Sequence, residues 1–267
     1  MKKAKKIIVR LAVIVLALYA LVLVLLYFYQ EKLLFHPEVI GKDTALMLPK
    51  GVSEEYIAMA DGVKLNGLLL RNKNAKGLVF YLHGNGGNAA GWGESILYAF
   101  PEAYDLFVLD YRGYGKSEGT IQSEAQLIID VTTAFDYIVK KYDYKSVVVD
   151  GYSIGTGPAT QLAAKRDVKA LILQAPYYSL SELIDTKVPL VPDFVKRYKL
   201  ETCNYITKVK APVYIFHGTE DKLIPYSNCQ RLKQAAPDIT VIPIRGVGHN
   251  GINESQVFRG KVEEILR

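Results

Sequence analysis

Residues 145–166, Lys-Ser-Val-Val-Val-Asp-Gly-Tyr-Ser-Ile-Gly-Thr-Gly-Pro-Ala-Thr-Gln-Leu-Ala-Ala-Lys-Arg, place a serine between two glycines where a β-branched run ends and a helical pattern begins. The serine is Ser153, and Gly151 and Gly155 complete a G-x-S-x-G motif. At a strand-to-helix junction this motif forms a strained turn that raises the serine hydroxyl above the sheet edge. The turn also directs the N–H of Ile154 toward the space where an oxyanion would form during acyl transfer.

Two further strand-like runs end next to residues that suit this chemistry. Residues 212–217 are followed by a turn that reaches Asp221, and residues 239–244 by a loop that carries His249. The carboxyl ends of parallel strands share one edge of a sheet, so residues distant in the sequence can meet there. The order serine, carboxylate, histidine therefore predicts a triad of Ser153, Asp221 and His249, in which the histidine takes the serine proton and the carboxylate orients the ring.

The remaining acid and histidine candidates have simpler interpretations. Glu220 is the rival acid, and we expect it to be a solvated loop carboxylate. We expect His83 to brace a glycine-rich loop, His217 to be a satisfied core histidine, and His36 to lie in a linker before a proline. No H-E-x-x-H motif or Cys-x-x-Cys pair occurs, so the sequence predicts neither a metal nor a cofactor.

Six motifs follow one another along the chain. They are E-K-L-L-F-H-P at 31–37, H-G-N-G-G-N at 83–88, D-Y-R-G-Y-G-K-S-E-G at 110–119, G-Y-S-I-G at 151–155, H-G-T-E-D at 217–221 and G-H at 248–249. In these motifs the chain resembles the serine α/β-hydrolases, and within them the membrane-anchored Bem46/ABHD13-like esterase group. The resemblance covers residues 31–267. It implies Ser153 as nucleophile, Asp221 as acid, His249 as base, and the N–H of Asn85 as second oxyanion donor.

A dinucleotide-binding fold is a rival interpretation. Residues 84–89 fit G-x-G-x-x-A after an apolar run, and Asp110 ends the next run. This alternative leaves the serine, acid and histidine unexplained, which makes it the weaker one. The Gly-Lys-Ser at 115–117 does not complete a P-loop, because a P-loop needs glycine where Asp110 stands.

The net charge of +6 is concentrated at the N-terminus. Five basic residues precede the first acidic one and leave +1 for the rest; they are Lys2, Lys3, Lys5, Lys6 and Arg10. A nucleic-acid-binding protein would carry its basic surface on the folded domain, so the charge gives no support for that class.

Residues 11–29 carry no charge, and nineteen residues are about the length of helix needed to cross a bilayer. Tyr27, Phe28 and Tyr29 would form an aromatic belt at one end. No small-x-small cleavage site follows, which favours an uncleaved single-pass anchor over a signal peptide. By the positive-inside rule the N-terminus is expected in the cytoplasm and the catalytic domain outside it, in the periplasm if the protein is bacterial.

The rest of the chain alternates strand and helix patterns, as in an α/β-hydrolase fold with a mostly parallel eight-stranded sheet and helices on both faces. Strands are expected near 56–60, 63–70, 77–82, 105–110, 145–150, 168–173, 212–217 and 239–244, and helices near 123–141, 154–166, 226–236 and 253–266. The expected organisation is a tail and anchor at 1–30, a juxtamembrane linker at 31–55 and a hydrolase domain at 56–267.

Residues 176–210 break the alternation, and we expect them to form a small lid in which Tyr177 and Tyr178 contact substrate. We call them the lid segment. Cys203 and Cys229 are the only cysteines, and the sequence leaves open whether they form a disulfide.

The sequence thus favours a serine hydrolase that cleaves small-molecule carboxylic esters or thioesters through an acyl-enzyme. A serine peptidase of the same fold and a non-catalytic, membrane-tethered binding module remain alternatives.

Overall fold

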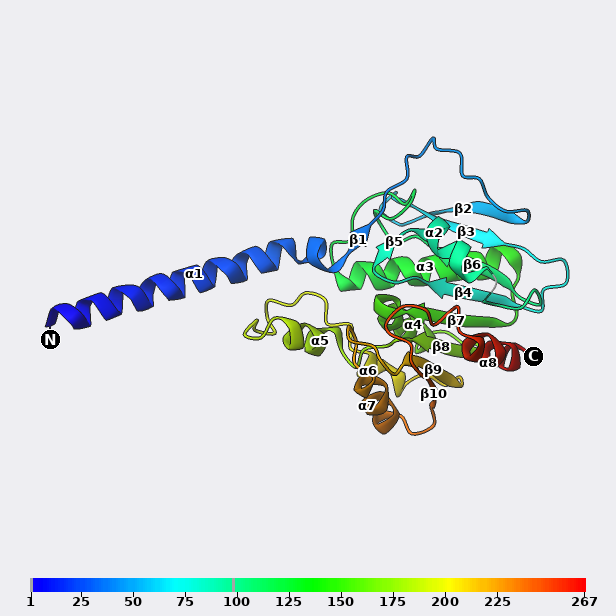
Figure 1. Ribbon diagram of the computed structural model, residues 1–267. Helices are drawn as coiled ribbons and strands as arrows, with labels where there is room; N and C mark the ends of the chain where they lie inside the picture. Colours follow the sequence, from blue (N-terminus) through cyan, green and yellow to red (C-terminus); the bar gives the residue numbers. More distant parts are fainter. Residues whose placement is uncertain (1, 98) are drawn as a thin grey trace.

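An eight-stranded sheet forms the centre of the structure, a computed structural model that describes residues 2–97 and 99–267 (Figure 1). The strand order is β10-β9-β8-β7-β4-β6-β3-β2, and all neighbours are parallel except β6-β3 and β3-β2. The strands are β2 (Val52–Ala58), β3 (Lys64–Leu70), β4 (Leu78–Leu82), β6 (Asp105–Leu109), β7 (Val147–Tyr152), β8 (Ala170–Gln174), β9 (Val213–Gly218) and β10 (Thr240–Ile244). The expected mostly parallel sheet is confirmed.

Helices cover both faces of this sheet, also as expected. They are α2 (Ala89–Ile96), α3 (Glu124–Tyr142), α4 (Thr156–Ala163), α7 (Ser227–Ala235) and α8 (Gln256–Leu266). Side chains of α3, α4 and α7 share one core with Phe80, whereas α2 and α8 pack on the opposite face with Tyr81. All five residues of β4 are buried, which is why that strand is a continuous apolar run.

The carboxyl ends of the parallel strands lie on the side of the domain that faces α1 (Lys2–Leu34) (Figure 1). Directly after α1, β1 (His36–Pro37) pairs in parallel with β5 (Gly86–Gly87), which follows the end of β4. The long helix is therefore attached beside the edge at which the site was expected.

Residues 31–55 are not simply a linker. The first four belong to α1, and β2 begins at Val52, four residues before the expected start of the hairpin. Helix α1 continues past Tyr29 because its polar residues find partners in the domain: Glu31 pairs with Arg197 at 2.7 Å and accepts the Tyr198 hydroxyl at 3.0 Å.

The lid segment contains two short helices, α5 (Leu180–Lys187) and α6 (Thr202–Ile206), and its α5 end lies beside α1 (Figure 1). Gln30 joins the two: its Nε2 donates to the Val195 carbonyl at 3.1 Å, and its Oε1 accepts the Arg197 N–H at 2.8 Å. Helices α2, α5 and α6 were not predicted from the sequence.

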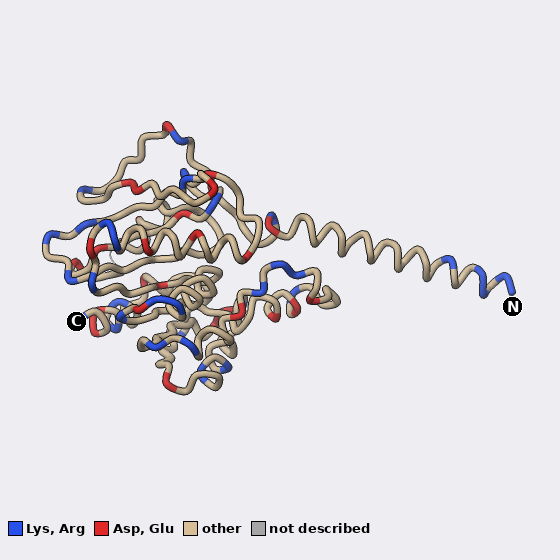
Figure 2. Tube along the Cα trace, turned by 180° about the vertical axis from the view of Figure 1, so that it is seen from behind, with Lys and Arg blue, Asp and Glu red and all other residues tan. Residues whose placement is uncertain are grey.

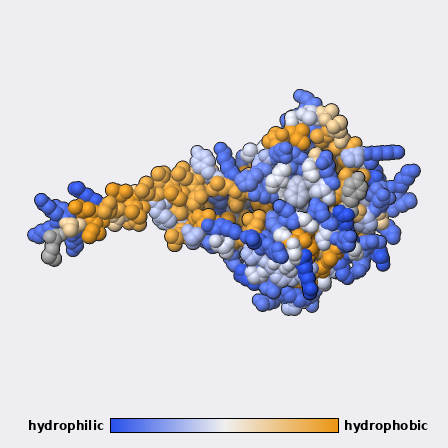
Figure 3. Space-filling model, viewed as in Figure 1, coloured by the Kyte–Doolittle hydropathy of each residue, from blue (hydrophilic) through white to orange (hydrophobic). Residues whose placement is uncertain are grey.

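Helix α1 consists of a short basic part at its free end and a long apolar part after it. Lys and Arg gather at its free end, followed by a long stretch without charge (Figure 2). That stretch is apolar and uncovered (Figure 3), and its most apolar window is not buried against the domain. Among the described residues, α1 is the one helix long and apolar enough to cross a membrane.

Candidate active site

Ser153 lies at the sharp turn between β7 and α4, where a single 3₁₀ turn covers Ser153–Gly155. Its φ of 52° is in the left-handed region, a strained conformation for a residue with a side chain. The flanking glycines are needed for space: a Cβ on Gly155 would lie 2.2 Å from the Leu82 carbonyl oxygen, and one on Gly151 would lie 2.6 Å from the Cβ of Ala159. The tight turn thus depends on both glycines of the motif.

His249 joins Ser153 to Asp221, as the sequence predicted. Its Nε2 lies 2.9 Å from Ser153 Oγ, and its Nδ1 lies 2.8 Å from Asp221 Oδ2. The Tyr152 hydroxyl donates to the His249 carbonyl at 2.6 Å and holds the histidine loop against the end of β7. A continuous path of hydrogen bonds from carboxylate to imidazole to hydroxyl is the arrangement that activates a serine nucleophile.

The Asp221 carboxylate is buried, and both of its oxygens accept hydrogen bonds. Its Oδ1 accepts the N–H groups of Leu223 and Ile224, both at 2.8 Å. Burial by itself raises the pKa of Asp221, but hydrogen bonds from His217, His249 and the Ile224 N–H outweigh it and hold the pKa well below its usual range. The group is therefore ionised at neutral pH and can stabilise a positively charged His249.

His217, expected to be only a core histidine, contacts this acid. Its Nε2 lies 2.8 Å from the Ile224 carbonyl oxygen and 3.3 Å from Asp221 Oδ2. The side chain is fully buried at the end of β9. Glu220, the rival acid, is exposed, and its N–H donates to the Val247 carbonyl.

The N–H groups of Asn85 and Ile154 flank the nucleophile turn: Asn85 follows the end of β4, and Ile154 lies in the 3₁₀ turn that begins at Ser153. The peptide units around them are held firmly. The Tyr177 hydroxyl donates to the Ile154 carbonyl at 3.0 Å, and the Tyr114 hydroxyl to the Asn85 carbonyl at 2.6 Å. Asn85 Oδ1 also accepts the His36 N–H at 3.2 Å. Such preorganised donors suit an oxyanion, because they need no rearrangement when charge develops.

The prediction that Tyr177 contacts substrate is wrong for this structure. Its side chain is fully buried under the nucleophile turn, where its hydroxyl is bonded to Ile154. Tyr178 is half-buried: its N–H donates to Asn228 Oδ1 at 3.0 Å, and its ring lies 3.8 Å from the guanidinium carbon of Arg231. Tyr177 therefore supports the site from below.

The glycine-rich loop is not arranged for a dinucleotide. Asp110 Oδ1 accepts the N–H of Ala89, the first residue of α2, at 2.7 Å, and Asn88 Oδ1 accepts the Gly91 N–H at 3.0 Å. These are the helix N–H groups that would bind a pyrophosphate in a dinucleotide fold. Because the protein's own side chains occupy them, the rival interpretation fails.

The motif at 110–119 supports this loop, a role the sequence did not indicate. The Tyr111 hydroxyl donates to the His83 carbonyl at 2.9 Å, and the buried His83 ring bonds through Nδ1 to the Gly84 carbonyl at 2.7 Å. Arg112 bonds Asp130 through Nε at 2.6 Å and thereby ties the turn to α3. Tyr111 and Tyr114, three residues apart in this motif, are the sequence signal that could have predicted this support.

Cys203 and Cys229 are both free. Burial raises the pKa of the Cys229 thiol to about 12, so it stays protonated. Within the ranges that the structure describes, no group of three or more His, Cys, Asp or Glu side chains could hold a metal ion.

The chain is similar in sequence to a known protein family and to several curated proteins. The family described as alpha/beta hydrolase fold matches residues 77–204. Protein bem46 of Schizosaccharomyces pombe is 32% identical over 79% of this chain and 76% of its own length. Alpha/beta hydrolase domain-containing protein 17C of Xenopus tropicalis is also 32% identical, over 61% of this chain and 52% of its own length.

Solved structures share the fold. An esterase from Pyrococcus furiosus superposes with a TM-score of 0.70 at 20% identity and covers 86% of this chain and 98% of its own. Est1E from Butyrivibrio proteoclasticus, solved with ferulic acid bound, gives a TM-score of 0.62 at 22% identity over 79% of this chain and 96% of its own.

Proposed function

Since this chain belongs to the serine α/β-hydrolase superfamily and, within it, to the Bem46-like group, we propose that it is a serine hydrolase of carboxylic esters or thioesters. The observation that carries the proposal is the pair of hydrogen bonds that His249 makes, at 2.9 Å to Ser153 Oγ and at 2.8 Å to Asp221 Oδ2. The substrate is a small-molecule acyl ester or thioester of unspecified chain length, and the reaction needs no cofactor.

The reaction follows from the roles of these atoms. Ser153 Oγ attacks the acyl carbon while His249 Nε2 takes its proton, and the ionised Asp221 stabilises the imidazolium that results. The N–H groups of Ile154 and Asn85 bind the oxyanion of the tetrahedral intermediate. His249 then returns the proton to the leaving alkoxide or thiolate, and the acyl group remains on Ser153. Water, with His249 as base, releases the acid and restores the serine.

Reaction with a fluorophosphonate tests this proposal directly. We expect the wild-type protein to be labelled at Ser153 and to hydrolyse p-nitrophenyl acetate. Ser153→Ala should lose labelling and at least about 10³-fold in turnover. It should keep its fold, because the Ser153 hydroxyl contributes little packing at the turn.

A panel of esters, thioesters and anilides with one common acyl group then separates the substrate classes. Faster cleavage of anilides than of esters would favour the peptidase alternative. Wild-type protein that neither labels nor turns over any substrate would favour the non-catalytic binding module, and unchanged turnover by Ser153→Ala would remove Ser153 as nucleophile.

We further propose that α1 is an uncleaved single-pass anchor. Its apolar stretch is long enough to span a bilayer, and basic residues at its free end favour a cytoplasmic N-terminus, with the catalytic domain on the other side of the membrane. The alternative, a cleaved signal sequence, would remove residues such as Gln30 that bind the lid segment. Mass spectrometry of the mature N-terminus distinguishes the two.

A further inference from the structure

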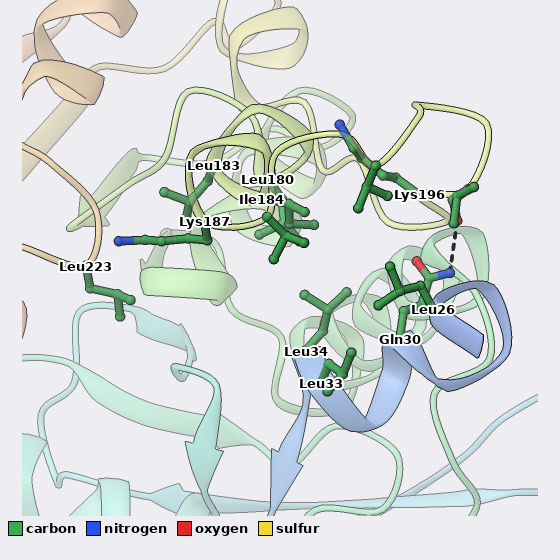
Figure 4. Close-up of a pocket in the computed structure, with 13 residues that line it drawn as sticks. Leu26, Gln30, Leu33, Leu34, Leu180, Leu183, Ile184, Lys187, Lys196 and Leu223 are labelled. Carbon is green, nitrogen blue, oxygen red and sulfur yellow. Dashed lines mark hydrogen bonds between the residues drawn. The ribbon is translucent and has the colours of Figure 1, made fainter. Parts of the chain in front are cut away.

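An apolar pocket of about 320 Å³ lies between the end of α1 and the lid segment. Leucines of α1, including Leu26, Leu33 and Leu34, face Leu183 and Ile184 of α5 across the opening (Figure 4). This size is at the lower end of the range of about 300–1,000 Å³ found for small-molecule sites. Neither wall makes the pocket alone, because α1 supplies one side and the lid segment the other.

The polar atoms at the pocket are already paired. Lys196 Nζ is held by Asp185 at 2.6 Å and Asp193 at 3.0 Å, and Lys187 Nζ donates to the Lys222 carbonyl at 3.4 Å. Gln30 is bonded to the backbone of the lid segment. The lining therefore offers hydrocarbon to an occupant, which fits an aliphatic chain and disfavours a charged molecule.

The pocket adjoins the acid of the triad. Leu223 lines it, and the N–H of the same residue donates to Asp221 Oδ1 at 2.8 Å. The pocket thus lies on the side of the domain where the parallel strands end. Through Leu223, the pocket wall is joined directly to the residue that bonds His249.

Beyond Leu26, which lines the pocket, the apolar surface of α1 continues toward the free end of the helix (Figure 3). The tip of the lid segment reaches Tyr19, whose hydroxyl donates to the Leu190 carbonyl at 2.6 Å. At 1.5 Å per residue, Tyr19 lies about 12 Å along the helix from Tyr27, within the apolar stretch. Leu190 and Phe194 are 82% and 79% exposed at this tip, although both are large and apolar. Side chains with this exposure beside a membrane-spanning helix match a lipid environment.

We propose that this pocket receives the acyl chain of an ester or thioester that resides in the bilayer, and that the chain enters laterally between α1 and the lid segment. The proposal rests on the proposed hydrolase function and specifies its substrate class as long-chain and membrane-resident. Leu33 and Leu183, on opposite walls, then determine acyl-chain specificity.

Filling the pocket tests this. Full-length protein in phosphatidylcholine vesicles is assayed with dissolved p-nitrophenyl acetate and with p-nitrophenyl palmitate embedded in the vesicles. We expect Leu33→Trp and Leu183→Trp each to lose about ten-fold or more in kcat/KM for palmitate, because the added ring occupies the pocket, and to keep wild-type turnover of acetate. Leu33 is 59% exposed, so its replacement does not disturb the core. Leu25→Trp on the same helix but outside the pocket, and Ile129→Trp on α3, are matched controls that should change neither rate.

The outcomes separate this inference from the function on which it rests. Wild-type protein that cleaves neither substrate overturns the proposed function. Wild-type protein that cleaves acetate but not palmitate, or pocket variants with an unchanged palmitate-to-acetate ratio, overturn the inference alone.

A binding measurement gives a second readout that needs no turnover. Ser153→Ala protein in the same vesicles is irradiated with a p-nitrophenyl ester whose fatty chain ends in a diazirine. We expect crosslinks in peptides covering 26–34 and 180–196. Crosslinks confined to residues 7–25, the lipid-facing part of α1, would mean that the chain stays in the bilayer and would overturn the proposal.

Discussion

Replacing Asp221 by Asn tests the triad at the atoms that set the tautomer of His249. Asp221 Oδ1 accepts two backbone N–H groups, from Leu223 and Ile224, and Oδ2 accepts His249 Nδ1, all at 2.8 Å. An asparagine has one acceptor oxygen, and the two backbone donors hold it in place, so the NH₂ group must face Nδ1. Because NH₂ is a donor, Nδ1 must accept, and the imidazole proton moves to Nε2, where it faces Ser153.

A histidine with its proton on Nε2 cannot take the proton of Ser153. We therefore expect Asp221→Asn to lower kcat by about 10⁴-fold, the size of effect known for a wrong-tautomer triad. This corresponds to about 5 kcal/mol of transition-state stabilisation. The fold should persist, because the new side chain has the same shape and both backbone hydrogen bonds remain.

Hydrolysis of p-nitrophenyl acetate measures the effect, and thermal unfolding reports the fold. Glu220→Gln is the matched control: the same chemical change at the neighbouring residue, which is exposed, should leave kcat near wild type. A folded Asp221→Asn protein within about ten-fold of wild type would refute the tautomer argument. A large loss in Glu220→Gln instead would assign the acid to Glu220.

Three further predictions concern packing, pH and topology. Gly155→Ala should lower the free energy of unfolding, measured by urea titration, by about 1–3 kcal/mol, since the added Cβ would lie 2.2 Å from the Leu82 carbonyl oxygen. Gly260→Ala in α8 is the control: a Cβ has open space there, and the free energy of unfolding should rise by about 0.5–1 kcal/mol. Folding lowers the pKa of Asp221, so the ionised carboxylate stabilises the fold at pH values above its unfolded pKa of about 3.9, and this stabilisation is lost as the pH falls below that value. Asp221→Asn should therefore lose less stability on acidification than the wild-type protein, as measured by thermal unfolding across pH. Protease added outside intact cells or spheroplasts should digest the catalytic domain, and α1 should keep undigested protein in membranes through a high-salt wash; protease resistance would reverse the orientation.

The sheet, and the meeting of Ser153, Asp221 and His249 at one of its edges, were predictable from the sequence because local patterns determine them. The buried strand β4 is a continuous apolar run, β7 begins with three consecutive valines, and the G-x-S-x-G spacing is required by the two close contacts at Gly151 and Gly155. Asp221 and His249 each follow a strand that ends at the same edge. The prediction that they meet therefore needed only that these strands run parallel, so that their carboxyl ends share one edge.

What the sequence did not reveal depends on contacts between distant segments. Helix α2 contains Gly91 and Gly93, which disfavour a helix, and it is stabilised by Asn88 and by Asp110 from the next strand. Tyr177 lies in a segment whose apolar and aromatic residues are typical of a lid. The path of the chain after β8 nevertheless buries its side chain. No local pattern records either interaction.

The connection between α1 and the catalytic domain has little slack. One buried residue, Phe35, separates the end of the helix from His36, whose N–H bonds to Asn85 in the proposed oxyanion loop. With α1 in a bilayer, the catalytic atoms are held at one height above the membrane, and the domain cannot swing outward as it could on a flexible tether. The protein would then select substrates by position as well as by chemistry: an acyl bond at that height is cleaved, whereas the same bond carried far above the lipid surface on a long soluble segment is not.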